Sequence, residues 1–186
     1  MADENKQEKK ADLLDRLDRV LGWIRACDMK TSILLAIIGL IITIFSSEFS
    51  LTEFKTIIDY NFNDFDFSNF LFLALTFIFF VSFCMGIICL VVELSPSMLS
   101  SKNNNKDIDS LYFFETISKK ELLAFKDEIL KTSIEEDIND VIKQLYINSK
   151  ICTQKYRYTK AGVFYTMVGS SGILIMFLIG RVILYH

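Results

Sequence analysis

Residues 25–45 read R-A-C-D-M-K-T-S-I-L-L-A-I-I-G-L-I-I-T-I-F, and this stretch decides the fold. A charged amphipathic segment passes here directly into a run of apolar residues, and no proline interrupts the passage. Asp28 and Lys30 stand at the junction, where a helix leaves water for lipid. The stretch predicts one helix that begins in the cytosol and continues into a membrane span, so that movement of one part is felt by the other.

Two further apolar windows extend this prediction to the whole chain. Of the 186 residues, 52% are hydrophobic and 17 are Phe, which is typical of a membrane protein rather than a soluble domain. We predict an all-α membrane protein with three transmembrane helices and a small helical cytosolic region. The expected order is a cytosolic amphipathic helix (1–30), a first span (31–49), an external loop (50–69), a second span (70–92), a cytosolic helical region (93–160) and a third span (161–184).

The distribution of basic residues predicts the orientation in the membrane. The segment through Lys30 holds seven Lys and Arg, the segment 48–69 holds one against five acids, and the segment 94–160 holds eleven. By the positive-inside rule, the N-terminus and the central region are cytosolic and the C-terminus is external. Roughly 30 mostly polar residues precede the first apolar run and no small-residue cleavage pattern follows it, so we expect this span to remain in the mature protein.

The composition also disfavours several functions. The N-terminal region balances seven basic residues against seven acidic ones, whereas nucleic-acid binding needs a net basic surface, so we expect no nucleic-acid partner. Gly-rich phosphate loops and nucleophile elbows are missing, and we do not expect an enzyme. No cysteine or histidine spacing predicts a metal or a cofactor, and the four cysteines are interpreted as reduced apolar fillers.

Two long helices are expected to run from the cytosol into the membrane. Residues 1–10 are polar and expected to fray, and a helix then begins at Ala11. It either lies on the membrane surface or packs on other cytosolic helices, and its mixed-sign polar face favours packing. A second helix is predicted from 133 through the third span to 184, about 75 Å long. The stripe of the first helix comprises Leu13, Leu17, Val20 and Ile24.

The segment between the second span and the last helix is expected to be irregular at first. Pro96 is predicted to end the second span, residues 100–107 to form a loop, and residues 110–118 to form a strand or an extended turn. Ser118 is predicted to cap a helix that runs to about 131, with Glu121 as its capping-box partner. The clustered acids Glu135, Glu136, Asp137 and Asp140 are interpreted as a solvated helix face.

Small residues recur within the spans at spacings that let helices approach closely in lipid. Three spans are few for enclosing a pathway, so we expect packing between subunits and a homo-oligomer. No span carries an ionisable residue at mid-membrane, which argues against a proton pump or an ion-coupled transporter. The helix-packing residues that we expect are Gly39, Gly86, Gly169 and Gly172.

Charged and aromatic residues gather near the cytosolic ends of the predicted spans. Aromatic faces stack nucleobases, and Lys or Arg side chains hold phosphates. An interface girdle around a small helical core is the alternative interpretation. The residues proposed for nucleotide sensing are Asp28, Lys30, Tyr112, Phe113, Glu115, Lys155, Tyr156 and Arg157.

Three segments, in order, resemble the Pycsar transmembrane effector family. W-I-R-A-C-D-M-K-T-S-I-L-L-A (23–36) resembles its A-D-x-K-A-S-x-L-L-A opening, with Thr31 in place of the usual Ala. S-L-Y-F-F-E-T-I (110–117) is similar to its L-x-F/Y-F-G-D-I segment, with Phe114 for Gly and Glu115 for Asp. D-V-I-K-Q-L-Y-I-N-S-K-I-C-T-Q-K-Y-R-Y-T-K-A (140–161) is similar to its Q-x-x-x-x-S-x-I-x-x-x-K-Y-x-x-L-x-x-A helix.

The resemblance implies a bacterial antiphage effector in the inner membrane. In that family a partner cyclase makes cyclic CMP or cyclic UMP on infection, and the effector senses the nucleotide and impairs the membrane, so the cell dies before phage mature. The resemblance thus implies a cyclic nucleotide as ligand and makes residues 93–160 a sensor region. Binding would re-angle the spans, and subunits would assemble or open.

Other classes remain open from the sequence. A ligand-independent, holin-like pore former fits the size and the three spans, although the segment 94–160 is larger than a holin needs. A structural membrane adaptor would recruit a protein through the long helix and leave the membrane intact. A two-span effector of another nucleotide-signalling system is disfavoured by the third span. The sequence leaves open the nucleotide, the subunit number, and whether the lesion is a pore or a rupture.

Overall fold

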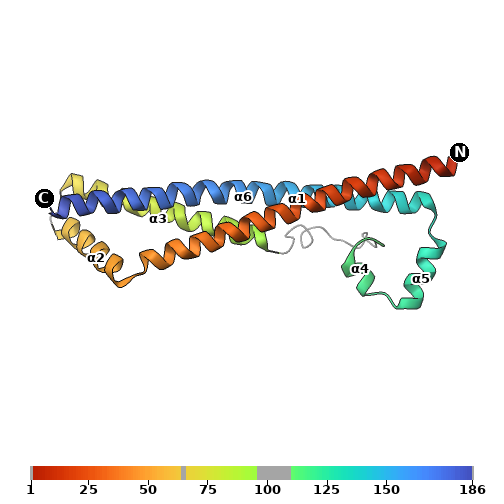
Figure 1. Cartoon of the computed structure of the whole chain (residues 1–186), viewed down its shortest axis with the longest axis horizontal. Coiled ribbons are helices and arrows are strands. Elements are labelled where there is room, and N and C mark those ends of the chain that lie inside the picture. Colours follow the sequence, from red (N-terminus) through yellow and green to blue (C-terminus); the bar gives the residue numbers. More distant parts are fainter. Residues whose placement is uncertain (1, 64–65, 96–109, 186) are drawn as a thin grey trace. The chain divides into compact units, whose positions relative to one another are not determined.

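Helices make up all the regular structure in the computed structural model, which describes residues 2–63, 66–95 and 110–185 (Figure 1). Three of these helices, α1, α3 and α6, are long and apolar enough to cross a membrane. The prediction of an all-α protein with three spans is confirmed. Pro96, residues 100–107 and His186 lie outside the described residues. The helices are α1 (Ala2–Phe45), α2 (Glu48–Asn63), α3 (Phe67–Leu94), α4 (Phe114–Ser118), α5 (Leu122–Lys131) and α6 (Ile134–Tyr185).

The chain divides into two compact units. The first unit consists of Met1–Cys27 and Ser95–Lys155, and the second unit consists of Asp28–Leu94 and Tyr156–His186. The apolar spans belong to the second unit, whereas α4 and α5 belong to the first. Helices α1 and α6 contribute residues to both units without a break in their helical hydrogen bonding. The predicted continuity of these two helices into the spans is therefore confirmed.

In the second unit, α3 and α6 pack closely because small residues face large ones. A Cβ added to Gly169 would clash with the backbone of Phe83, and one added to Gly162 would clash with Leu90. The hydroxyl of Ser82 donates a hydrogen bond across the contact to the carbonyl of Tyr165 at 3.1 Å. Such short backbone separations give helices in lipid the dispersion contacts that hold them together.

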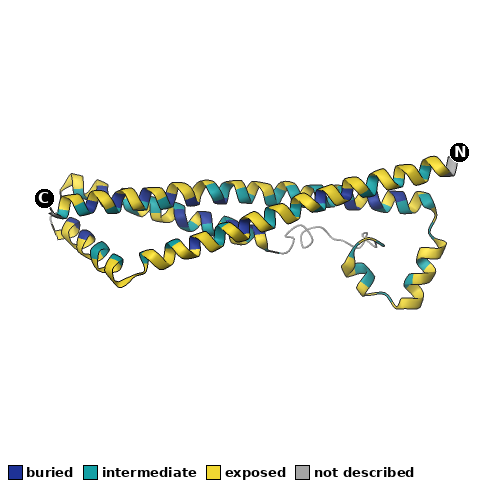
Figure 2. Ribbon diagram, viewed as in Figure 1, coloured by how far each residue is buried: buried dark blue, intermediate teal, exposed yellow. Residues whose placement is uncertain are grey.

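Most of residues 50–69, which were predicted as an external loop, belong to α2. Ile57 of this helix is buried with Phe72 of α3 and Met176 of α6. Figure 2 colours part of α2 as buried or intermediate. The rings of Phe54 and Phe177 stack with centroids 4.9 Å apart. The helical spacing of Phe54 and Ile57 gives α2 an apolar face that packs on the ends of two spans.

The connection between α1 and α2 is a tight polar turn. The hydroxyl of Ser47 accepts a hydrogen bond from the backbone N–H of Ser50 at 3.4 Å, and the carbonyl of Ser47 accepts one from the N–H of Leu51 at 3.0 Å. These bonds satisfy donors in the first turn of α2. The apolar part of α1 therefore ends at Phe45, four residues before the predicted end of the first span.

The N-terminal residues of α1 are helical rather than frayed. Lys6 pairs with Glu135 of α6 at 2.6 Å, and Lys10 pairs with Asp137 of α6. These contacts, to partners about 130 residues away in sequence, hold the first turns of α1 in the first unit. Leu17 and Val20 are buried, which confirms that the apolar stripe of this helix packs within the protein. The i,i+4 pairs Asp12–Arg16 and Asp15–Arg19 also form.

The predicted capping box at Ser118 is wrong, because α5 begins only at Leu122, without a side-chain cap. The hydroxyl of Ser118 instead donates to the carbonyl of Glu115. A reciprocal capping box forms at the start of α6. The backbone N–H of Ser133 donates to the carboxylate of Glu136 at 2.9 Å, and the N–H of Glu136 donates to the hydroxyl of Ser133 at 3.3 Å.

Candidate functional site

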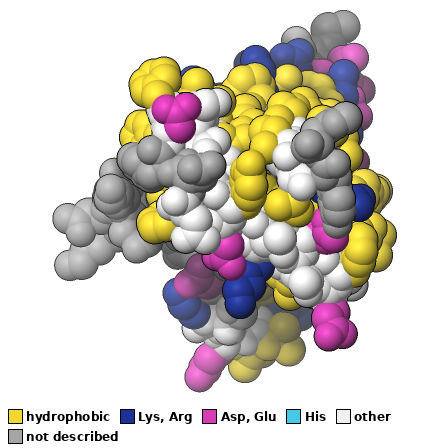
Figure 3. Space-filling view, turned by 90° about the vertical axis from the view of Figure 1, so that its left-hand side faces the viewer, with side chains coloured by type: hydrophobic (Ala, Val, Ile, Leu, Met, Phe, Trp, Pro, Cys, Tyr) yellow, Lys and Arg dark blue, Asp and Glu magenta, His cyan; other side chains and the backbone are white. Residues whose placement is uncertain are grey.

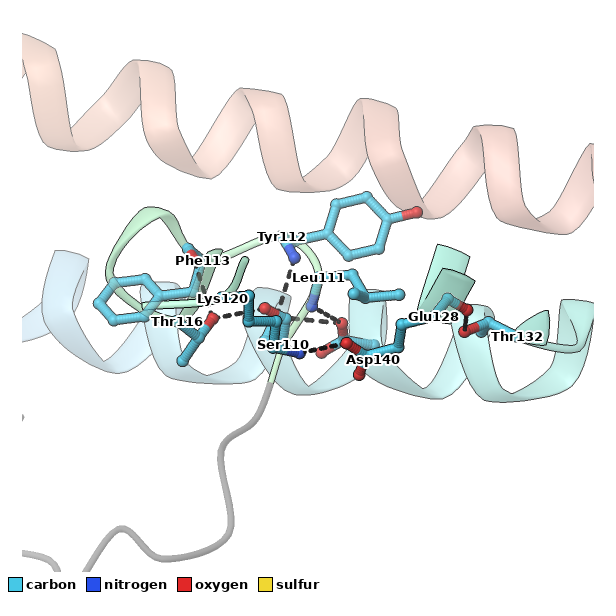
Figure 4. A network of polar contacts seen from close by, with 9 residues as sticks. All are labelled: Ser110, Leu111, Tyr112, Phe113, Thr116, Lys120, Glu128, Thr132 and Asp140. Carbon is cyan, nitrogen blue, oxygen red and sulfur yellow. Dashed lines mark hydrogen bonds and ion pairs between the residues drawn. The ribbon is translucent and has the colours of Figure 1, made fainter. Parts of the chain in front are cut away.

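The candidate site in the first unit is built around the segment 110–118, which packs on α6 (Figure 4). The carboxylate of Asp140 accepts hydrogen bonds from the Ser110 hydroxyl at 3.0 Å and from the Leu111 N–H at 2.8 Å. The Ser110 hydroxyl also accepts a bond from the N–H of Tyr112 at 3.1 Å. Ser110 is fully buried. One carboxylate of α6 therefore fixes the backbone at the start of the segment.

Thr116 closes the same segment from its other end. Its hydroxyl contacts the carbonyls of Ser110 and Phe113, and its N–H donates to the carbonyl of Phe113 at 3.1 Å. Residues 110–118 thus form a turn followed by the short helix α4. Of the two predicted structures for this segment, the strand is therefore wrong and the turn is confirmed. The carbonyls of Ser110 and Phe113 are satisfied within the segment rather than by a neighbouring strand.

Tyr112 joins the segment to α1 through Asp137. The Tyr112 hydroxyl donates a hydrogen bond to Asp137 Oδ1 at 2.6 Å, and the ammonium of Lys10 pairs with Asp137 Oδ2. Asp137 is therefore shared by three segments that are distant in sequence. We call these three residues, Lys10, Tyr112 and Asp137, the latch.

The electrostatics of the latch favour the charged forms of Asp137 and Lys10 and the neutral form of Tyr112. Burial acts to raise the pKa of Asp137, but hydrogen bonds from Lys10 and Tyr112 outweigh it and leave the pKa below its ordinary value. The hydrogen bond to Asp137 raises the pKa of Lys10, against the opposing effect of burial. Burial, together with the bond to Asp137, raises the pKa of Tyr112.

A second ion pair ties α5 to Lys120, two residues before the helix begins. The ammonium of Lys120 contacts the carboxylate of Glu128 at 2.6 Å, and the Lys120 side chain is only 16% exposed. The Thr132 hydroxyl donates to the carbonyl of Glu128 at 2.7 Å, at the end of α5. These bonds fix both ends of α5, although none of its side chains is buried.

The eight predicted sensing residues do not fall in one compact unit. Tyr112, Phe113, Glu115 and Lys155 belong to the first unit, and the other four, Asp28, Lys30, Tyr156 and Arg157, belong to the second.

Within the first unit, Tyr112 and Phe113 share the turn described above. The rings of Phe113 and Phe114 lie 5.0 Å apart, and Glu115 pairs with Lys119 at 2.9 Å. Phe114 itself, which stands where the family has Gly, starts α4 with its side chain largely exposed.

In the second unit, the predicted residues have polar and exposed settings. The carbonyl of Asp28 accepts a hydrogen bond from the Ser32 hydroxyl at 2.8 Å. Lys30 and Arg157 are exposed, and the Tyr156 side chain is 61% exposed. Thr31, adjacent to Lys30, is completely buried, and its hydroxyl lies 3.4 Å from that of Thr159. This contact joins α1 to α6 where the apolar segments begin.

Sequence reasoning missed Lys10, Asp137 and Asp140 as parts of the site. The acids at 135–140 were interpreted as a solvated face, which is wrong for Asp137 and Asp140. These two are three residues apart and so share one face of α6, toward the segment 110–112. Their spacing, together with the S-I-E-E capping signal at 133–136, is the available sequence clue.

The four predicted helix-packing glycines have different surroundings. An added Cβ would clash with Thr166 at Gly86, with Phe83 at Gly169 and with Phe79 at Gly172. All three therefore lie at close contacts between α3 and α6. Gly39 has nothing within 4 Å of such an added atom. It makes no close packing contact with the described part of its own chain.

A metal site requires a cluster of acidic, histidine or cysteine side chains. No group of three or more His, Cys, Asp or Glu side chains among residues 2–63, 66–95 and 110–185 is placed to hold a metal ion. The four cysteines, at positions 27, 84, 89 and 152, are free thiols. Burial raises the pKa of the Cys152 thiol, which makes it less reactive.

The fold defines an all-α, multi-span membrane protein whose spans continue into a polar helical unit. The chain belongs to the Pycsar effector protein family, since the family model described as the Pycsar effector protein domain matches residues 12–183. The resemblance drawn from the three sequence segments is confirmed. The chain is also similar to the Pycsar effector protein GmPycTM of Gulbenkiania mobilis, at 29% identity over 192 residues, covering 95% of this chain and 96% of that protein. No solved structure matches the chain.

Membership of this family supports a role as an antiphage effector located in a membrane. The family is one of effectors rather than of catalytic enzymes.

Proposed function

We propose that this chain senses a cyclic pyrimidine mononucleotide, cyclic CMP or cyclic UMP, and in response impairs the bacterial inner membrane, causing abortive infection. A partner cyclase would supply the nucleotide. The observation that carries the proposal is that α1 and α6 each contribute to the polar first unit and, unbroken, to the apolar second unit. A ligand that changes the packing of their polar parts therefore acts on the same helices that form two spans.

The segment 110–118 supports a sensing role for the first unit. Tyr112 has its hydroxyl anchored by Asp137, and about a third of its side chain remains exposed. An aromatic ring held in this way is a suitable surface for stacking a pyrimidine base. Phe113, beside it, adds a second ring. Asp137, which anchors this ring, lies 18 residues and so about 27 Å along α6 from Lys155, far more than one mononucleotide spans. We therefore propose Tyr112 and Phe113 as a base-stacking surface of the first unit that is separate from the cations described next.

The phosphate requires cationic donors, and we propose Lys155, Arg157 and Lys30 for this role. Arg157 and Lys30 are exposed and so accessible to an anion. Tyr156, which stands between Lys155 and Arg157, offers a further exposed ring. In the second unit, we propose Asp28 as an acceptor for the amino or imino group of the base or for the ribose hydroxyl. In the first unit, we propose Glu115 as an acceptor beside the rings of Tyr112 and Phe113.

The latch offers a physical basis for a switch. Asp137 bonds to both Lys10 and Tyr112, so a ligand that draws Tyr112 or Lys10 toward itself weakens the link among α1, α6 and the segment 110–118. A ligand shifts such an equilibrium only by as much as its affinities for the two states differ. We propose that the active state, in which the spans have moved, binds the nucleotide more tightly.

We further propose that the N-terminus is cytosolic, that the C-terminus is external and that subunits assemble in the active state. The lopsided distribution of basic residues supports the orientation. The open surroundings of Gly39 support a contact between subunits on that side of α1.

Calorimetry of the purified full chain against cyclic CMP, cyclic UMP, cyclic AMP and cyclic GMP tests the sensing step. We expect saturable binding of a cyclic pyrimidine nucleotide and little binding of the purine nucleotides. Two double variants should each lose this binding. One combines Asp28→Ala with Lys30→Ala, and the other combines Lys155→Ala with Arg157→Ala.

The matched control, Lys126→Ala with Lys143→Ala, removes two exposed positive charges elsewhere and should bind as the wild type does. Absence of binding for every nucleotide would overturn the proposal. Equal losses in the test and control variants would instead overturn the assignment of the residues.

A further inference from the structure

The apolar part of the first span is shorter than the hydrocarbon core of a membrane. This part, residues 31–45, is about 22 Å long, whereas a hydrocarbon core is about 30 Å thick. After the turn at Ser46 and Ser47, α2 continues the chain and packs on the ends of α3 and α6. Glu53 of α2 pairs with Arg181 of α6 at 3.2 Å. Figure 3 views this end of the molecule and shows hydrophobic side chains over much of its surface.

A cavity of about 590 Å³ lies where α1 gives way to α2. It is lined by residues from the end of α1, from α2, from α3 and from α6, all of which belong to the second unit. Its walls are mostly large apolar side chains, among them Phe45, Phe54, Ile58, Phe77, Phe80 and Ile173.

We infer the depth of the cavity in the bilayer from its distance to Arg181 along α6. Ile173 and Ser170, two of its lining residues, precede Arg181 by about 12 and 16 Å along α6. Half of a hydrocarbon core is about 15 Å thick. We take the Glu53–Arg181 ion pair as the edge of the hydrocarbon, which places the cavity mostly within the leaflet on the side of α2.

Two of the three polar side chains that line the cavity, Thr76 and Ser170, are satisfied by their own helices, and the third is Ser46 at the turn. The Thr76 hydroxyl donates to the carbonyl of Phe72 at 2.9 Å, and the Ser170 hydroxyl donates to the carbonyl of Met167 at 3.3 Å. Such a wall gives water few partners and suits a hydrocarbon.

We propose that one acyl chain of a bilayer phospholipid occupies this cavity and fills the gap that the broken first span leaves. A methylene group is close in size to a water molecule, which takes about 30 Å³, so the cavity holds about twenty chain carbons. A helix from a second copy is about 10–12 Å thick, so a single turn of it would already fill the cavity. The open side of α1 at Gly39 suits a second copy better.

Native mass spectrometry tests this proposal on the full chain. The protein is reconstituted into vesicles of phosphatidylethanolamine and phosphatidylglycerol and then extracted into mild detergent. We expect the wild type to retain one phospholipid per protomer. Ser170→Phe and Thr76→Phe place a ring in the cavity and should lose the bound phospholipid. Ser171→Phe, at the exposed neighbouring position, is the matched control and should retain it.

Thermal unfolding of each variant in the same detergent identifies any that fail to fold, and two independent cavity variants guard against that outcome. Retention of the phospholipid by a folded Ser170→Phe or Thr76→Phe variant overturns the proposal. The proposal is also overturned if the wild type retains no phospholipid and its chemically crosslinked dimer is lost in Ser170→Phe. That result would assign the cavity to a second copy of the chain.

Discussion

Tyr112 and Asp137, 25 residues apart in sequence, are joined by a hydrogen bond of 2.6 Å from the phenol to the carboxylate. Lys10 approaches the other oxygen of the same carboxylate. Through this one side chain, α1, α6 and the segment 110–118 hold one another in the first unit. The two helices involved are those that continue into membrane spans.

Replacement of Asp137 by Asn should destabilise the first unit. The amide keeps the shape of the side chain but removes the charge that pairs with Lys10, and hydrogen bonds to charged groups contribute about 1.5–3 kcal/mol each. Hydrogen exchange of residues 110–118 should become faster. The control Asp127→Asn removes an exposed acid paired with Lys131 and should leave the exchange unchanged. Unaltered exchange in Asp137→Asn would contradict the account of the latch.

Replacement of Asp140 by Ala should loosen the start of the same segment. The Leu111 N–H and the Ser110 hydroxyl would both lose their acceptor, and each unsatisfied buried group costs about 1–3 kcal/mol. Asp140→Asn keeps one oxygen acceptor, so its free energy of unfolding should lie between those of the wild type and the Asp140→Ala variant. Denaturant unfolding measures the order of the three proteins. An Ala variant as stable as the Asn variant would show that Asp140 does not hold the turn.

The latch should weaken at both ends of the pH scale. The pKa of Asp137 is lowered below 3.8, so its contribution to stability is present above that value and is lost as the pH falls through the folded pKa. The pKa values of Lys10 and Tyr112 are raised above 10.5 and 10.0, so their contributions are lost as the pH rises through the folded values. Denaturant unfolding at acid, neutral and alkaline pH measures both losses. The Asp137→Asn variant should show a smaller acid loss, and an equal loss would exclude Asp137 as the source.

Glycine substitutions should separate contacts within the chain from contacts between chains. Gly169→Ala places a Cβ against the backbone of Phe83 and should destabilise the second unit by about 1–3 kcal/mol, as overpacking does. Gly39→Ala meets nothing within 4 Å and should be neutral or slightly stabilising, because Ala favours helix over Gly. Thermal unfolding in detergent checks both. Similar losses at the two positions would contradict the described packing.

A bulkier change at Gly39 tests assembly. Gly39→Leu should leave the stability of the protomer nearly unchanged, because a Cβ at this position meets nothing within 4 Å. Chemical crosslinking in vesicles should then show fewer oligomers than the wild type forms. If the crosslinked species persist unchanged, subunits do not meet through this side of α1.

Much of the fold could be predicted because its signals are local. The apolar windows and the uninterrupted run from Ser133 to Leu184 predict α3 and α6 directly, since bilayer thickness sets the length of a span. Helix α2 was missed because its apolar face appears only when residues 54, 57 and 58 are placed at helical spacing. The first turns of α1 were missed because they depend on ion pairs with Glu135 and Asp137.

The candidate site was only partly predictable for the same reason. Tyr112 and Phe113 stood out as aromatic residues in a short polar region. Their anchoring partners are acids of α6 that, taken singly, have the composition of a solvated helix face. Only the fold places Lys10 beside Asp137, because no local pattern links residues that are so far apart in sequence.

Dye leakage from proteoliposomes is the most direct test of the central claim, that nucleotide sensing in this chain impairs a membrane. The full chain should release dye on addition of cyclic CMP or cyclic UMP and should retain it with cyclic AMP, cyclic GMP or buffer. Lys155→Ala with Arg157→Ala should abolish the release, and Lys126→Ala with Lys143→Ala should not. Leakage without nucleotide would indicate a holin-like pore, and no leakage with any nucleotide would contradict the account.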